Sequence, residues 1–252
     1  TGAVAAPVYC KKGIMKKLFF LLSAMAISFA GNASVIINAT RIIYPAQAKY
    51  VNVQLVNRSK TTHLVQSWID TGNASAAPET IKTPFSLTPP VVKMAANEGQ
   101  ALKLTIVNSE LLPKDKESVF WLNVLDVPPV PEGAREGENY LQVALRSRIK
   151  LLYRPVGLSE PGNDTLKKVS VSQQAGSTCL KNDSPHYITI SEMINWQGGD
   201  LKKKTMDKNL LTNTAFLAPY SCTQIVGNIK PAGKYRAAWI DDYGSKRYVV
   251  MN

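Results

Sequence analysis

Apolar and polar residues alternate along much of the chain with a period of two. The segments KYVNVQLVN and QALKLTIVN place an apolar side chain at every second position, and HLVQSWID and SVFWLNVLDV add two further strongly apolar stretches. Successive side chains of a β-strand point to opposite faces, so this pattern predicts strands with one buried face. Turn-forming stretches separate the segments, and signals for helices are few. The sequence therefore predicts an all-β protein.

The longest alternating stretch is YLQVALRSRIKLLYRP, residues 140–155. One face carries Leu141, Val143, Leu145, Ile149, Leu151 and Tyr153, and the other carries the cations Arg146, Arg148, Lys150 and Arg154. A strand from Leu141 to Tyr153 would span roughly 43 Å at about 3.3 Å per residue, whereas an ordinary strand has about 5–6 residues. Such a strand, apolar on one face and cationic on the other, is longer than an ordinary sandwich requires.

The pattern divides the chain into two parts at the turn-rich linker RPVGLSEPGND. Residues 34–155 contain seven or eight short strands, which is the number and spacing of an antiparallel sandwich. Residues 156–252 repeat the pattern of strands and turns in a smaller unit. A chain of 252 residues with 45% hydrophobic residues can form two packed domains.

Residues 15–33 have the features of a secretory signal peptide. Met15 is followed by two lysines and by an apolar run that is too short to span a membrane, and small residues lie before Ser34. We expect cleavage after Ala33, secretion, and no membrane insertion afterwards; a buried helix is the alternative. Residues 1–14 are interpreted as upstream sequence outside the native protein. Cleavage would remove four lysines and no acids, which lowers the formal charge from +12 to +8.

The three cysteines of the chain indicate whether the protein works in an oxidising or a reducing compartment. Cys10 precedes the signal peptide, so the mature chain keeps the pair Cys179 and Cys222. An even pair in a secreted protein predicts a disulfide. Two cysteines without nearby histidines make a poor zinc site, so no metal is expected.

No catalytic motif is convincing. Asp70-Thr71-Gly72 is the triplet of aspartic proteases, but that chemistry needs two carboxylates and the chain has one such triplet, which also reads as a plain turn. The two histidines, His63 and His186, stand in no recognisable nucleophile motif. Phosphate-binding glycine loops and nucleic-acid motifs are absent from the sequence. We expect no enzyme, no cofactor and no nucleic-acid partner.

The segment LQVALRSRIKLLYRP closely resembles the last strand of the first domain in PapD-like periplasmic pilus chaperones. The segments LPKDKESVFWLNVLDVPP, QSWID, TPPVVKM, NDSPHYITI, LAPYSC and IDDYG match the same family, in the same order and over the whole mature chain. The resemblance implies two immunoglobulin-like sandwiches set as an L with a cleft between them. It also implies a function: the chaperone lends a strand to pilus subunits that lack their last one, and an outer-membrane usher receives them.

The resemblance assigns roles to particular residues. Leu141, Val143 and Leu145 would be the donor strand, whose unpaired edge would otherwise be an aggregation hazard. Arg41 and Lys150 match the pair that holds the C-terminal carboxylate of the subunit. Glu117, Arg154 and Asp242 match a charge network between the domains.

The short loop before the last strand of the first domain, and the lack of cysteine in the strands that flank it, resemble the short-loop branch of the family. A secreted immunoglobulin-like adhesion or binding module without a donor strand is the alternative function. A self-capping oligomer of the client-free protein is one alternative to a client-free monomer, and the sequence does not choose between them.

Overall fold

The computed structural model describes residues 34–131, 133, 140–174, 176–203 and 206–251. The expected signal peptide, its cleavage site, Cys10 and residues 1–14 lie outside the described residues. Nearly all regular structure in the described part is β-strand, as the alternation predicts. The exceptions are one turn of 3-10 helix at Pro78–Thr80 and one short helix, α2, at Asn163–Leu166. In this part of the chain no helix is both long and apolar enough to cross a membrane.

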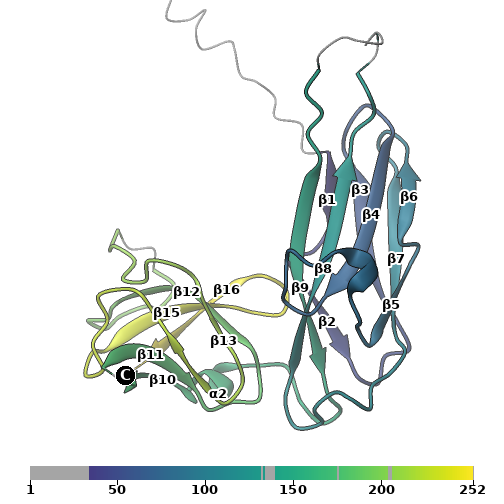
Figure 1. The fold of residues 1–252 in the computed structure, drawn as a ribbon. Helices are drawn as coiled ribbons and strands as arrows, with labels where there is room; N and C mark the ends of the chain where they lie inside the picture. Colours follow the sequence, from purple (N-terminus) through teal and green to yellow (C-terminus); the bar gives the residue numbers. More distant parts are fainter. Residues whose placement is uncertain (1–33, 132, 134–139, 175, 204–205, 252) are drawn as a thin grey trace, which may run out of the picture. The chain divides into compact units, whose positions relative to one another are not determined.

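The first half of the chain folds into two facing sheets (Figure 1). One sheet has the order β2-β9-β8-β4-β6, with strands Arg41–Pro45, Leu145–Arg154, Ser118–Val127, His63–Asp70 and Val91–Met94. The other has the order β1-β3-β7-β5, with strands Val35–Ile37, Val51–Asn57, Gly99–Ile106 and Phe85–Thr88. The chain changes sheet at each connection from β1 to β8, and the connection between β5 and β6 is made by the Pro-Pro pair.

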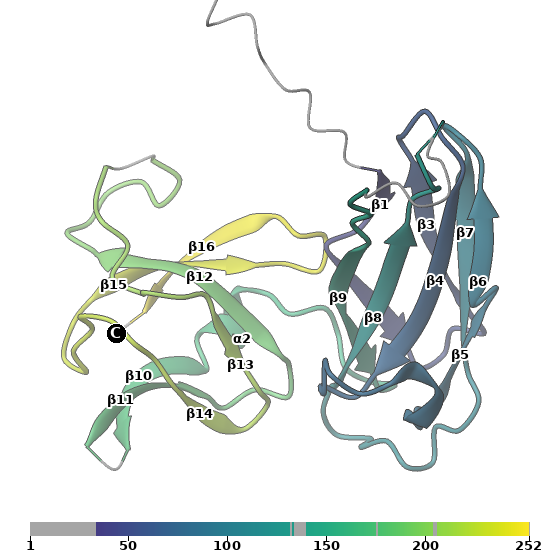
Figure 2. The same ribbon diagram turned by 45° about the horizontal axis from the view of Figure 1, so that its top comes forward.

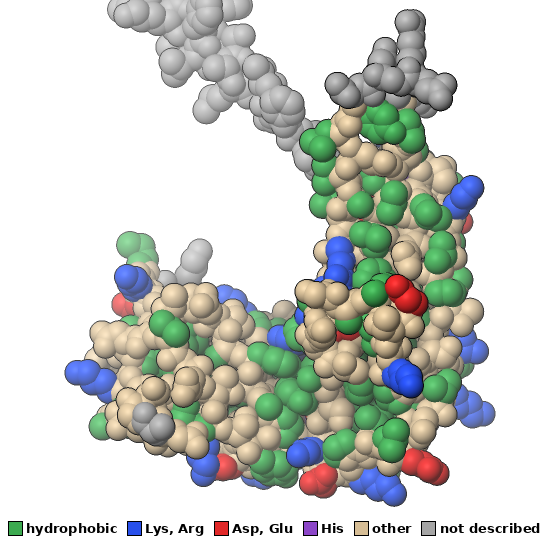
Figure 3. Space-filling view, viewed as in Figure 1, with side chains coloured by type: hydrophobic (Ala, Val, Ile, Leu, Met, Phe, Trp, Pro, Cys, Tyr) green, Lys and Arg blue, Asp and Glu red, His purple; other side chains and the backbone are tan. Residues whose placement is uncertain are grey.

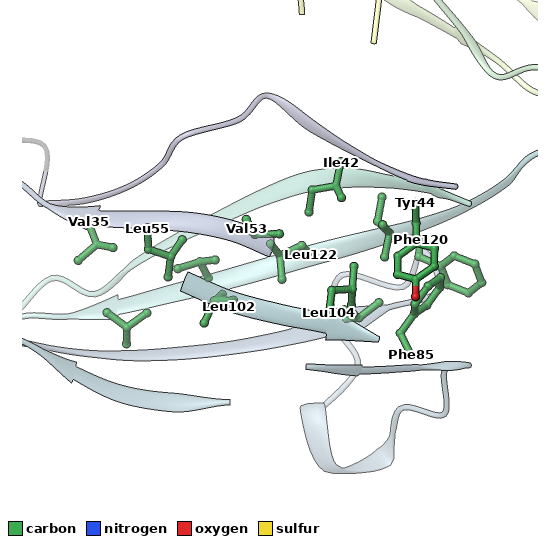
Figure 4. Close-up of a cluster of buried hydrophobic side chains, with 14 of the residues drawn as sticks. Val35, Ile42, Tyr44, Val53, Leu55, Phe85, Leu102, Leu104, Phe120 and Leu122 are labelled. Carbon is green, nitrogen blue, oxygen red and sulfur yellow. The ribbon is translucent and has the colours of Figure 1, made fainter. Parts of the chain in front are cut away.

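The core of this sandwich is built from the inward faces of both sheets. Figure 4 shows Leu55 and Leu102 of one sheet turned toward Ile42 and Leu122 of the other. These four side chains are at most 5% exposed. The alternating apolar positions of the sequence are therefore the ones that fill the interior.

Strand β9 has two differently supported halves. It pairs antiparallel with β8 along its length, from Leu145 opposite Asp126 to Tyr153 opposite Ser118. On its other side, β2 pairs in parallel with Lys150–Arg154 only. Residues 145–149, called the open half of β9 below, therefore have β8 on one side and no strand on the other among the described residues (Figure 2).

The strand begins later than the alternation predicts, at Leu145 instead of Leu141. Continued beyond Ala144, the ladder register would place Val143 and Gln142 opposite Pro128 and Pro129, which directly follow β8. Proline has no N–H to give to a ladder, so pairing ends there. Residues 140–144 are described, but they belong to no strand.

The second half of the chain forms a smaller pair of sheets. One has the order β10-β11-β14, with strands Val169–Gln174, Ser177–Asn182 and Ser221–Gln224. The other has the order β13-β12-β15-β16, with strands Ala215–Leu217, Ile188–Asn195, Tyr235–Ile240 and Lys246–Met251. The expected disulfide is present: Cys179 of β11 and Cys222 of β14 are bonded, with their Cα atoms 5.6 Å apart.

Candidate functional site

The candidate donor residues are uncovered. Leu141 is 86% exposed, and Val143 and Leu145 are each 54% exposed. In the space-filling view, hydrophobic side chains reach the surface near the end of the first sandwich where β9 begins (Figure 3). Together with the open half of β9, they put apolar side chains and unpaired backbone groups side by side, which is the arrangement that another strand can complete.

Arg41 and Lys150 lie directly opposite each other in the parallel β2–β9 ladder. The Nη1 of Arg41 donates to the carbonyl of Ile240 at 3.1 Å, while its Nε is buried without a partner. Lys150 has neither a hydrogen bond nor an ion pair within the described part of the chain. Two neighbouring cations with unused donors form a site ready for an anion such as a carboxylate.

Burial disfavours the charged forms of Arg41 and Lys150. Burial, with a smaller contribution from the charge of Arg41, lowers the pKa of Lys150 to about 8. Burial also lowers the pKa of Arg41, although Asp242, Asp241 and Glu117 oppose the shift. A bound anion would offset this cost, so the two cations favour an anionic partner.

Aromatic rings surround the Lys150 ammonium. Its Nζ lies 3.8 Å from the ring centre of Phe216 and 5.8 Å from that of Trp121. Phe216 in turn stacks on Tyr187, with ring centres 5.1 Å apart. These cation–π contacts hold the ammonium in place while it has no anion. The alternation of the sequence gave no sign of this cluster, because its members come from strands and loops far apart in the chain.

Glu117, Arg154 and Asp242 come together as the resemblance implied. Arg154 bonds Glu117 through Nε at 2.8 Å and Asp242 through its two terminal nitrogens at 2.7 and 3.0 Å. The other oxygen of Glu117 accepts the backbone N–H of Tyr187 at 2.8 Å. The network thereby links the residue before β8 and the last residue of β9 to Tyr187 and Asp242 in the second half of the chain.

The ionisation of Glu117 fits this network. Burial raises its pKa, but His186, Arg154 and the Tyr187 N–H lower it more, so the pKa lies below its ordinary value. His186 Nδ1 lies 3.3 Å from the Glu117 carboxylate. This histidine was not assigned a role from the sequence.

Asp70 is not arranged for protease chemistry. It is 1% exposed and its carboxylate is bound by Arg148, Asn123 and the N–H of Gly72, which forms the turn expected there. Burial raises the pKa of Asp70, but these hydrogen bonds and the charge of Arg148 together have the larger effect, so the pKa lies below its usual range. A carboxylate that is bound by an arginine, an amide and a backbone N–H favours the ionised form, so Asp70 is not placed to share a proton with a second acid. His63 is likewise engaged, with Nδ1 at 2.6 Å from Asp126.

Comparison with protein families agrees with this geometry. Residues 34–159 match the N-terminal domain of PapD, described as a pili and flagellar-assembly chaperone, and residues 164–248 match the C-terminal domain of the pili assembly chaperone PapD. The chain belongs to the PapD-like pilus assembly chaperone family. It is therefore a chaperone built from two immunoglobulin-like sandwiches, and this family is not enzymatic.

Individual members of the family are similar over nearly their whole length. The probable fimbrial chaperone YehC of Escherichia coli K12 is 40% identical over 235 residues, covering 93% of each chain. The chaperone protein HifB of Haemophilus influenzae is 38% identical, covering 93% of this chain and 95% of HifB. The crystal structure of the Pseudomonas aeruginosa CupB2 chaperone is 29% identical, with a TM-score of 0.68, and covers 86% of this chain and 98% of CupB2.

Proposed function

We propose that this PapD-like chaperone caps pilus subunits by lending them the open half of β9 and the segment before it. Leu141, Val143 and Leu145 would enter the apolar groove of a subunit that lacks its last strand. Main-chain hydrogen bonds along residues 145–149 would complete the subunit's sheet. The exposure of these three apolar side chains, next to an unpaired strand edge, is the observation that carries the proposal.

The exposed fractions set the size of the effect. Full burial of an aliphatic side chain stabilises by about 1.5–3 kcal/mol. Weighted by their exposed fractions of 86%, 54% and 54%, the three residues together contribute about 3–6 kcal/mol on binding, before the ordering of the segment is counted. This contribution alone does not hold a stable complex, so the backbone hydrogen bonds and a further anchor are needed as well.

Arg41 and Lys150 are that anchor in our proposal, and its ligand is the C-terminal carboxylate of the subunit. Their unused donors support it. Fixing the end of the subunit chain also fixes its register, because a slip by one residue would turn every apolar side chain to the wrong face. Glu117, Arg154 and Asp242 would hold the surroundings of this anchor in place without touching the subunit.

We also propose that residues 15–33 are a signal peptide that is cleaved after Ala33, so that the chaperone works in the periplasm. Family membership supports the compartment, and SfaE, a solved relative with 29% identity, is itself described as a periplasmic chaperone. The Cys179–Cys222 disulfide fits an oxidising compartment as well. The completed subunits would pass from there to an outer-membrane usher.

Co-expression with a pilus subunit encoded in the same gene cluster tests the anchor. Arg41→Ala and Lys150→Met should each abolish the 1:1 complex in periplasmic extracts, because each removes one of two cations from the carboxylate. Lys103→Met is the matched control, since Lys103 lies over the Tyr50 ring in the other sheet, 4.8 Å from its centre. Normal yield of the complex from both anchor variants would refute the assignment.

A further inference from the structure

The buried Asp70 at the end of β4 has no part in the proposed function so far. Its two carboxylate oxygens accept Arg148 Nε at 2.9 Å and Nη2 at 2.6 Å, which is a two-point ion pair. Asn123 Nδ2 donates to the same carboxylate at 2.7 Å. A carboxylate taken out of water is stable only with such partners, so the position is built around Arg148.

The ion pair crosses a whole strand. In the ladder registers, Asp70 lies opposite Trp121 of β8, whereas Arg148 of β9 lies opposite Asn123. Arg148 therefore reaches diagonally over β8, with its guanidinium 4.1 Å from the centre of the Trp121 ring, to bind the next strand but one. Figures 1 and 2 show β4, β8 and β9 side by side in that order.

Arg146 repeats this arrangement two residues earlier on the same face. Its Nε and Nη2 donate to Asn123 Oδ1 at 3.0 and 2.7 Å, and its Nη1 donates to the carbonyl of Ala74 at 2.7 Å. Its guanidinium lies 4.8 Å from the centre of the Trp68 ring. Asn123 thus connects Arg146 to Asp70, and both arginines of the open half are fastened across β8.

Apart from these arginines, the open half is held by its ladder with β8 and by Ile149, which packs on the core. It has one neighbouring strand instead of two, and Leu145 at its start is 54% exposed. Segments with few buried contacts and one-sided pairing open locally at low cost. A binding edge that is already held in the bound conformation loses less entropy when its partner arrives.

We infer that Asp70 is a positioning residue of this chaperone: through Arg148 and Asn123 it holds the open half of β9 flat on β8, ready for a subunit strand. The inference rests on the proposed function, because it concerns the same edge. In this role Asp70 acts on the binding edge through its neighbours and does not itself contact the subunit.

Hydrogen exchange of the client-free protein tests this directly. Asp70→Asn keeps the size of the side chain and removes its charge, so the β8-bonded amides of residues 145–149 should exchange about tenfold faster or more. Amides of residues 150–154, which lie between β2 and β8, should keep their protection. Arg148→Lys is the second variant, which keeps the positive charge but cannot form the two-point pair.

Glu192→Gln serves as the control. Glu192 lies in the second sandwich, where it is paired with Arg236 at 3.2 Å, so its loss removes an ion pair without touching β9. The exchange rates of residues 145–149 in the Glu192→Gln variant should match those in the unaltered protein. In stopped-flow mixing with the subunit from the same gene cluster, the Asp70 and Arg148 variants should associate more slowly, while Glu192→Gln should not.

Three results would overturn the inference. Unchanged exchange at residues 145–149 in both variants would mean that the ion pair does not hold the strand. Faster exchange throughout the first sandwich, or selective opening with normal association, would mean that Asp70 serves stability alone. Should the unaltered protein capture no subunit, the proposed function would fall, and the exchange result would still decide whether Asp70 holds the open half.

Discussion

Val143→Glu separates a donor strand from an ordinary core strand. Val143 is 54% exposed, so less than half of its full burial energy of about 1.5–3 kcal/mol stabilises the protein itself. The variant should therefore lose no more than about 1.4 kcal/mol of unfolding free energy, or about 6 °C in melting temperature. In a complex, the same carboxylate would have to enter an apolar groove, which should weaken subunit binding by about 100-fold or more.

Ile149→Glu is the matched control on the same strand. Ile149 is partly buried and packs on the core of the first sandwich. The charge there should cost about 2 kcal/mol or more and lower the melting temperature by about 8 °C or more. Thermal melts followed by circular dichroism, together with subunit pull-down, read out both properties. A loss of stability in Val143→Glu as large as in Ile149→Glu would place Val143 in the protein's own core and refute the donor role.

Two further predictions concern charge and covalent structure. The affinity for the subunit should fall as pH rises from 7 to 9, because Lys150 with a pKa of about 8 loses the proton that the carboxylate requires; calorimetry with Lys150→Arg should show a flatter profile. Over the same range the unfolding free energy of the free protein should rise, because the folded chain releases the Lys150 proton while the unfolded chain keeps it, which relieves the cost of burying the charge. Replacing Cys179 and Cys222 by Ala should cost the second sandwich about 4 kcal/mol in urea unfolding, by the chain-entropy model. Exchange at residues 145–149 should not change.

The alternation of the sequence identified the strands well but misplaced one end. It marks which residues can face a core or a partner, and residues 141–145 keep that pattern whether or not a neighbouring strand exists. What ends β9 at Leu145 is the pair Pro128 and Pro129, which lies across the ladder and not within the alternating segment. The end of a strand depends on the pairing register between segments that are distant in the chain, and this register cannot be derived from the local pattern of a single sequence.

The candidate site shows the same division. Glu117, Arg154 and Asp242 were found through the family resemblance, and the structure joins them. The sequence around Asp70 indicates only a protease triplet or a turn, because its partner Arg148 is 78 positions away. Phe216 is also far from Lys150 in the sequence. Contacts of this kind depend on how strands are ordered in the sheets, which local patterns do not specify.

The prolines after β8 also have an evolutionary consequence. Because residues 141–144 belong to no strand ladder among the described residues, and Leu141 and Val143 are largely exposed, these two side chains contribute little to folding and substitutions of them are thermodynamically cheap. Leu151, fully buried a few positions later, has no such freedom. The sequence of residues 141–144 can therefore drift along with the grooves of the subunits it serves, while the rest of the strand is held by the demands of its own core.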